Sequence, residues 1–191
     1  MVDIVKDNVR VWSDMDSMVF WGPKGTPLPE TLTEALDDGF LPIGALSEDG
    51  PGEGVSVDVN KIKGWPAGQT LRIKTTSTEK TFSFTALEEK PVVTRIFYDH
   101  GAVTVTGTGD AAVARYDIPD SFGTVEGAMV TVLNDGNYKK VRCMELVQVS
   151  ERGDVSNGTE DPSGYELTVD NIGADYVLTN QPAYLAEATT P

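Results

Sequence analysis

The stretch Val55-Ser56-Val57-Asp58-Val59-Asn60 alternates apolar and polar residues without a break. The same period of two returns in Leu71–Thr76 and in Phe82–Leu87. Successive side chains of a β-strand point to opposite faces, so this alternation predicts half-buried antiparallel strands. These three segments make the expected fold class mainly β.

Turn residues fit this interpretation, with Pro66-Ala67-Gly68 expected to join the first two strands and Ser77–Lys80 the next two. Between Val59 and Ile62 the apolar phase slips by one residue. Such a slip would turn every later side chain to the other face, so we expect a β-bulge near Asn60-Lys61.

One segment, Pro91–Tyr98, has a helical period instead. Its apolar residues are spaced i, i+3 and i+4: Val93, Ile96 and Phe97. Pro91 suits the first turn and Gly101 suits the stop, which predicts a short amphipathic helix. A second, weaker helical pattern covers Leu32–Leu36, before Asp37-Asp38-Gly39.

The remaining alternation predicts further strands at 103–105, 112–118, 128–133, 138–149 and 165–169. Residues 128–133 are apolar on both faces, which indicates a strand covered twice: by its own core and by something else. Asn134–Asn137 contains Asp-Gly and is typical of a tight hairpin turn.

The expected architecture is therefore a β-sandwich or barrel with one flanking α-helix and long extended loops or an N-terminal arm. At 191 residues the chain fits one domain, residues 1–191. Within it we expect an extended, uncovered arm at about 22–54, a polar loop at about 151–163 and a flexible tail at about 181–191.

Charge and composition exclude several functions. Thirty acidic against 15 basic residues leave a net charge of −15, which repels nucleic acid phosphates and anionic lipid heads. No apolar run is long enough to cross a membrane, and the start lacks the pattern of a secretory signal. A single cysteine, Cys143, forms no internal disulfide and fits a reducing cytoplasm.

Catalytic chemistry is not expected either. His100 and Cys143 are the only residues of their types, so a Cys/His metal site of the usual kinds is excluded. No phosphate-binding loop or nucleophile-elbow motif is present. We therefore expect no enzyme, no catalytic residue, no cofactor and no metal.

The charges are unevenly distributed. Residues 25–60 hold eight acids and no Lys or Arg, and residues 151–191 hold eight acids and one Arg, whereas residues 61–80 hold five bases and one acid. Solvated loops are the simpler interpretation. The sharper hypothesis is self-association, in which acidic surface of one copy meets this basic segment of the next. The candidate subunit contacts are Trp65, Lys61, Lys63, Arg72 and Lys74.

An ordered series of segments resembles the major tail proteins, or tail tube proteins, of long-tailed non-contractile bacteriophages. The series comprises Gly22–Pro29, Phe40–Gly50, Ile62–Trp65, Thr81–Glu88, the helix from Pro91, Tyr138–Val149, Glu151–Asp154 and Gly164–Thr168. It spans residues 22–169, and no single motif in it is diagnostic.

This resemblance implies hexameric rings that stack into a hollow tube, in which loops and the N-terminal arm reach neighbouring copies. It implies an acidic lumen through which DNA slides unbound, with no membrane contact. Implied partners are the chain itself and tape-measure, tail-tip and tail-terminator proteins. The implied location is the virion tail, assembled in the host cytoplasm and used for DNA delivery into the host.

Two other functions remain open from the sequence. The first is a monomeric β-sandwich module that binds carbohydrate or a host surface, with Trp12, Trp21 and Trp65 as a stacking platform. The second is a small hydrolase with a carboxylate pair, which no supporting base or metal set accompanies.

Overall fold

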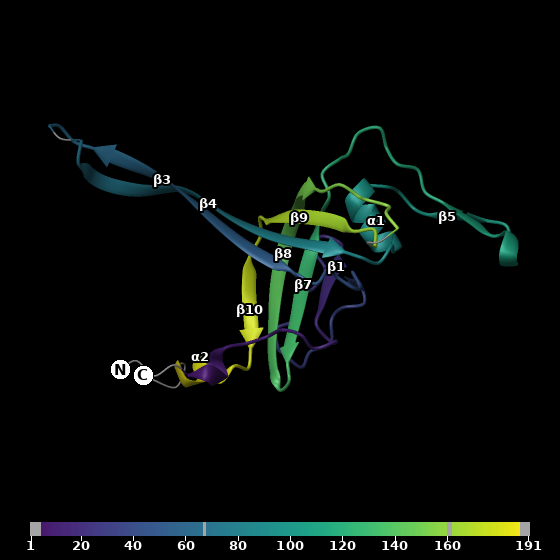
Figure 1. Cartoon of the computed structure of the whole chain (residues 1–191), viewed down its shortest axis with the longest axis horizontal. Coiled ribbons are helices and arrows are strands. Elements are labelled where there is room, and N and C mark those ends of the chain that lie inside the picture. The colour runs from purple at the N-terminus through teal and green to yellow at the C-terminus, as the bar shows by residue number, and fades with distance from the viewer. Residues whose placement is uncertain (1–4, 67, 160–161, 188–191) are drawn as a thin grey trace.

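The computed structural model describes residues 5–66, 68–159 and 162–187. Ala67, part of the polar loop and the end of the tail lie outside these ranges. The elements are the 3-10 turn η1 (Lys6–Asn8), β1 (Met18–Gly22), β2 (Leu41–Pro42), β3 (Gly52–Lys63), β4 (Thr70–Ala86), α1 (Pro91–Tyr98), β5 (Thr104–Thr106), the 3-10 turn η2 (Gly109–Ala111), β6 (Val113–Arg115), β7 (Glu126–Asp135), β8 (Tyr138–Arg152), β9 (Tyr165–Asn171), β10 (Asp175–Thr179) and α2 (Pro182–Glu187). Figure 1 shows a central body from which two extensions leave in opposite directions.

The body is one antiparallel sheet in the order β2-β1-β7-β8-β9-β4-β3, and β5 pairs with β6 in a separate two-stranded sheet. Strand β8 branches the large sheet. One edge of β8 pairs with β7, while the other pairs with β10 along residues 140–144 and with β9 along residues 147–152. The sheet therefore turns at β8, and in Figure 1 β9 and β4 run across β7.

The main core lies between the two halves of this bent sheet. It joins side chains of β1, β7 and β8 to those of β4 and β9, and α1 closes it. Its largest fully buried members include Phe82, Ile96, Met129, Met144 and Leu167. The predicted mainly β architecture with one flanking helix is confirmed, and α1 spans the predicted residues. The helix ends because Asp99 adopts a left-handed conformation (φ 50°), before the expected Gly101.

A second apolar cluster covers the opposite face of β7 and β8, and it corrects the prediction of an uncovered arm at 22–54. Phe40 is buried against Ala128, Val130, Val141 and Cys143. Three leucines of the same segment pack around this cluster: Leu28, Leu32 and Leu36. These side chains close the outer face of the sheet. The second cover expected over residues 128–133 is thus supplied by this chain itself.

Two local predictions are wrong. Ser77–Lys80 is no turn but the middle of β4, a single strand of 17 residues. Leu32–Leu36 forms a turn rather than a helix, and its leucines pack on the sheet. The irregularity predicted near Asn60-Lys61 is present as two register shifts that flank it, at Asp58/Val59 and Ile62/Lys63.

Other segments follow the prediction more closely. The β7–β8 turn uses Gly136 and Asn137, with Gly136 at φ 59°. The polar loop begins only after Arg152, because β8 is longer than expected. Elements that were not foreseen include β1, β2, β10 and the short exposed helix α2 at the start of the expected tail.

Candidate subunit interface

The most prominent feature of the surface is the β3–β4 hairpin. Beyond Thr81, where β9 stops pairing with β4, the two strands continue as a ribbon of two and leave the body (Figure 1). At 3.3 Å per residue, the part of β3 from Val55 to Lys63 reaches about 30 Å. A two-stranded hairpin without further cover is marginally stable in water, so this ribbon is suited to gain partners.

The ribbon has an apolar face that continues the core-facing side of the body. Glu53 of β3 lies opposite Phe82, whose side chain is in the main core, and the odd-numbered residues of β3 continue on that side. Its exposed apolar members are Val55 (69% exposed), Val57, Val59 and Ile73. In the body this side is buried in the main core against β1, β7 and β8, whereas on the ribbon no described residue covers it.

The five predicted contact residues lie together at the far end of this ribbon. Trp65 is 95% exposed in the loop that joins β3 to β4. Lys61 pairs with Ile73 and therefore shares the apolar face, while Lys74 pairs with Asn60 on the other face together with Arg72. Lys63 pairs with Thr70 next to the loop. All four bases are exposed, and in the described part of the chain none is within an ion pair.

A network of charged groups fixes the root of the ribbon. Arg142 Nη1 lies 2.7 Å from Glu53 Oε2, and its Nη2 donates to Asp175 Oδ2 at 2.9 Å. Lys80 Nζ donates to Asp175 Oδ1 at 2.6 Å, and Lys140 Nζ donates to Glu53 Oε1 at 3.3 Å. The hydrogen bond from Lys80, with that from Arg142, holds the pKa of Asp175 below its ordinary value against the opposing effect of burial. Four strands are thereby joined at the point where the ribbon leaves the body.

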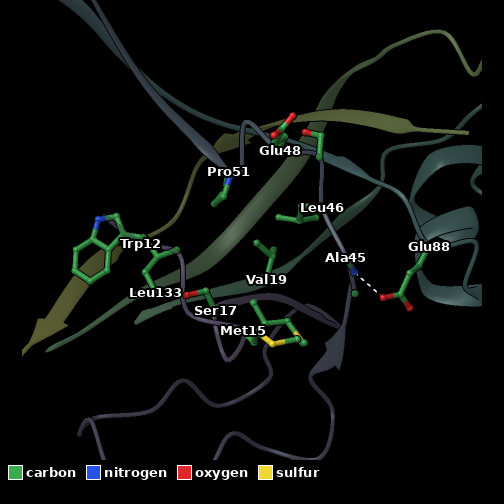
Figure 2. A pocket seen from close by; sticks show the side chains of 14 residues that line it. Trp12, Met15, Ser17, Val19, Ala45, Leu46, Glu48, Pro51, Glu88 and Leu133 are labelled. Carbon is green, nitrogen blue, oxygen red and sulfur yellow. Dashed lines mark hydrogen bonds between the residues drawn. The ribbon is translucent and has the colours of Figure 1, made fainter. Parts of the chain in front are cut away.

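A groove lies beside this root, where Pro51 leads into β3. Its volume is about 440 Å³, and the residues that line it include Trp12, Met15, Val19, Leu46 and Leu133. Figure 2 shows Val19 and Leu46 between Trp12 on one side and Glu88 on the other. Val19 is fully buried and forms the floor, whereas Met15 is 96% exposed at the edge. The groove is therefore apolar inside and open at its rim.

The rim of the groove is acidic. Glu88 accepts a hydrogen bond from the Ala45 backbone N–H at 2.6 Å and forms an ion pair with Lys90 at 2.6 Å. Both contacts lower the pKa of Glu88, and the contact with Lys90 has the larger effect. Gly44, at φ 100°, makes room for this carboxylate, because an added Cβ would lie 2.5 Å from the Glu88 side chain. Glu48 also lines the groove and is exposed. Because Lys90 neutralises the charge of Glu88, the net negative charge of this rim comes from Glu48.

The second extension, at residues 101–124, projects from the other end of the body (Figure 1). Its β5–β6 hairpin exposes Val105 and Val113, and Ile118 and Phe122 follow with about half of their surface exposed. Its base is anchored by His100, whose ring stacks on Tyr116 with centroids 4.3 Å apart. The molecule thus presents exposed apolar side chains at both ends.

The described residues offer little for catalysis or metal binding. They contain no group of three or more His, Cys, Asp or Glu placed to hold a metal ion. Burial raises the pKa of the Cys143 thiol to about 11, which opposes a role as nucleophile. Among the helices described here, none is both long and apolar enough to cross a bilayer.

Sequence reasoning identified the basic end of the ribbon but missed its apolar face, its root and the groove. Val55, Val57 and Val59 have the pattern of a core strand, yet they are exposed. A signal was present in the partner strand, since residues 74–80 contain no large apolar side chain. A core-facing pair of strands would bring apolar residues from both sides. The groove combines distant segments, which no local pattern connects.

No protein-family model matches the chain, and no curated protein matches it. Among solved structures, a chain from the tail of an empty gene transfer agent particle, refined with C6 symmetry, is similar: the identity is 11% and the TM-score 0.44, over 92% of this chain and 98% of that chain. A chain from the virion of a native gene transfer agent particle has 11% identity and a TM-score of 0.40, over 86% of this chain and 95% of that chain. At these values the likeness carries no argument about function.

Proposed function

We propose that the chain is a structural tail protein of a phage-like particle, which assembles from its own copies into stacked hexameric rings. The rings form a hollow tube through which DNA passes into the host. The resemblance of residues 22–169 to tail tube proteins implies six copies per ring, the stacking of rings and the passage of DNA through the tube. The proposal assigns the chain no catalytic step.

The observation that carries self-assembly is the uncovered apolar face of the β3–β4 ribbon. β3 is an edge strand of 12 residues, and in the described chain nothing pairs with its outer edge. Exposed edge strands with apolar side chains pair with other chains, and monomeric proteins shorten, charge or cover them. Here the apolar side chains are kept on a long ribbon, which favours a protein that uses this edge in an assembly.

Charge also helps to select how the copies are oriented in this contact. The end of the ribbon holds four exposed bases in a chain whose net charge is −15. Attraction between unlike surfaces speeds encounter and selects the register of contact more than it adds affinity. The acidic remainder of the surface suits a lumen from which DNA phosphates are repelled. Tape-measure, tail-tip and tail-terminator proteins are the further partners under this proposal, and the virion tail is the location.

Self-association of the full chain is the test. Sedimentation and light scattering from micromolar to millimolar concentration, with negative-stain electron microscopy, should show rings, tubes or oligomers that grow with concentration. A protein that remains monomeric throughout this range would contradict the proposal. A monomer that binds cell-wall glycans would favour the binding module instead.

A further inference from the structure

We propose that the apolar groove beside the ribbon root receives Trp65 from a second copy of this chain. This inference rests on the proposed self-assembly and names the two surfaces that meet. The occupant is the end of another ribbon, with Trp65 at its centre and Lys61, Lys63, Arg72 and Lys74 around it.

Trp65 and the groove are complementary in shape and polarity. Trp65 is a large apolar side chain that is 95% exposed, which is the state of an interface anchor before its partner arrives. The groove is lined by Trp12, Met15, Leu46 and Pro51 above the buried Val19. Pockets from about 300 Å³ upward bury ligands larger than an indole, so about 440 Å³ accommodates this side chain.

The two surfaces also carry opposite charge. Of the side chains that line the groove, Glu48 and Glu88 are acidic and none is basic, but Lys90 neutralises Glu88. Glu48 and the adjacent Asp49 are exposed and carry the net negative charge of the rim. The end of the ribbon has the opposite sign, because its four bases are exposed and lie outside the ion pairs of the described chain. An apolar anchor surrounded by cations therefore meets an apolar groove with Glu48 and Asp49 at its rim.

The two surfaces lie far apart on one molecule. Pro51 of the groove immediately precedes β3, whereas Trp65 follows its far end, about 45 Å away by strand geometry. A ribbon of this length does not fold back onto its own root. Because donor and acceptor are different patches, each copy gives one contact and receives one. Such head-to-tail contacts generate rings when they close and helical arrays when they do not.

Cysteine cross-linking in the full chain tests the contact directly. Gln69→Cys, in the exposed loop beside Trp65, and Met15→Cys are made in separate chains, so that Trp65 itself is retained. Cys143 is fully buried and stays in place. Under mild oxidation the mixture should form a Gln69→Cys/Met15→Cys dimer, and the double variant should form a ladder of oligomers. Ile118→Cys, on the other extension, serves as the competing site and should not cross-link to position 69.

A second measurement separates the two proposals. Trp65→Ser should weaken self-association about 30-fold or more, as loss of an aromatic anchor does, and Met15→Lys should weaken it as well. Association that persists unchanged in Trp65→Ser, or cross-linking of position 69 to position 118 instead of 15, would overturn the groove contact and leave self-assembly intact. Absence of association in the wild-type chain would overturn both.

Discussion

Arg142 joins Glu53 to the body: its Nη1 lies 2.7 Å from Glu53 Oε2, and 91% of the arginine side chain is shielded from solvent. Asp175 accepts from the second guanidinium nitrogen at 2.9 Å. The body's core-facing side thus ends in a charged network, and the exposed valines of the ribbon begin directly beyond it. The network holds the ribbon in one direction and leaves its apolar face free.

Asp175→Asn should lower the free energy of unfolding by about 2 kcal/mol near neutral pH, because charge-assisted hydrogen bonds from Lys80 and Arg142 are lost or weakened. The pKa of Asp175 is lowered in the folded chain from 3.8. Its stabilising effect is therefore full above that value and is lost as the pH falls through the folded-state pKa. Urea unfolding of both proteins at pH 7 and at decreasing acidic pH measures this.

The matched control is Asp117→Asn, since Asp117 forms an exposed pair with Arg115 and the change should cost less than about 1 kcal/mol. If the free energies of unfolding of the wild type and of Asp175→Asn differ by the same amount from pH 7 down to pH 2, the role given to this carboxylate is contradicted.

Phe40→Ala should destabilise the fold by about 3–5 kcal/mol, because Phe40 closes the second apolar cluster against Ala128 and Val130. Leu41→Ala, the adjacent exposed position, should cost less than about 1 kcal/mol. Denaturant unfolding distinguishes the two. Equal and small effects would mean that residues 23–40 do not cover the sheet in solution.

Reversal of Lys61, Lys63, Arg72 and Lys74 to Glu should weaken self-association at low salt, and added salt should reduce the difference from wild type. The control is a variant with four exposed bases reversed elsewhere: Lys6, Lys24, Arg95 and Arg115. Both variants have the same net charge. If light scattering finds both equally impaired, the effect is general repulsion and the end of the ribbon is no specific contact.

Cys143 should resist thiol reagents in the folded chain. It is fully buried, and burial raises its pKa to about 11. Its modification at pH 8 should therefore require opening or unfolding and be much slower than that of an exposed thiol. Phe40→Ala should accelerate it, since Phe40 lies in the same cluster. Rapid second-order labelling of the wild type would contradict the cover over β8.

The sequence was sufficient for features that depend on neighbouring residues. The period of two located most strands, and the i, i+3, i+4 spacing located α1 to the residue. Asp135-Gly136 located the β7–β8 turn because a positive φ is needed there. The clustered bases marked the end of the ribbon as a candidate contact.

What failed depends on tertiary contacts. Alternation of apolar and polar residues predicts a strand with two unlike faces, but it does not show whether the apolar face is covered. Val55 and Phe82 therefore have the same local pattern, although Val55 is exposed and Phe82 is buried. Ser77–Lys80 is rich in turn-forming and polar residues, yet pairing with β3 holds it extended. The cover that residues 23–40 give to β7 required contacts between positions about 100 residues apart.

Truncation of the ribbon tests the central claim, that copies of this chain associate through it. Val55 and Lys80 lie opposite each other, so residues 56–79 can be replaced by Asn-Gly, with the root network retained. The control shortens the other extension, with Asn-Gly in place of residues 107–112 between the paired Thr106 and Val113. Sedimentation and negative-stain microscopy should find a folded monomer for the first variant, and assemblies for the control and the wild type. Assembly of the ribbon-truncated chain at the wild-type concentration would contradict the account.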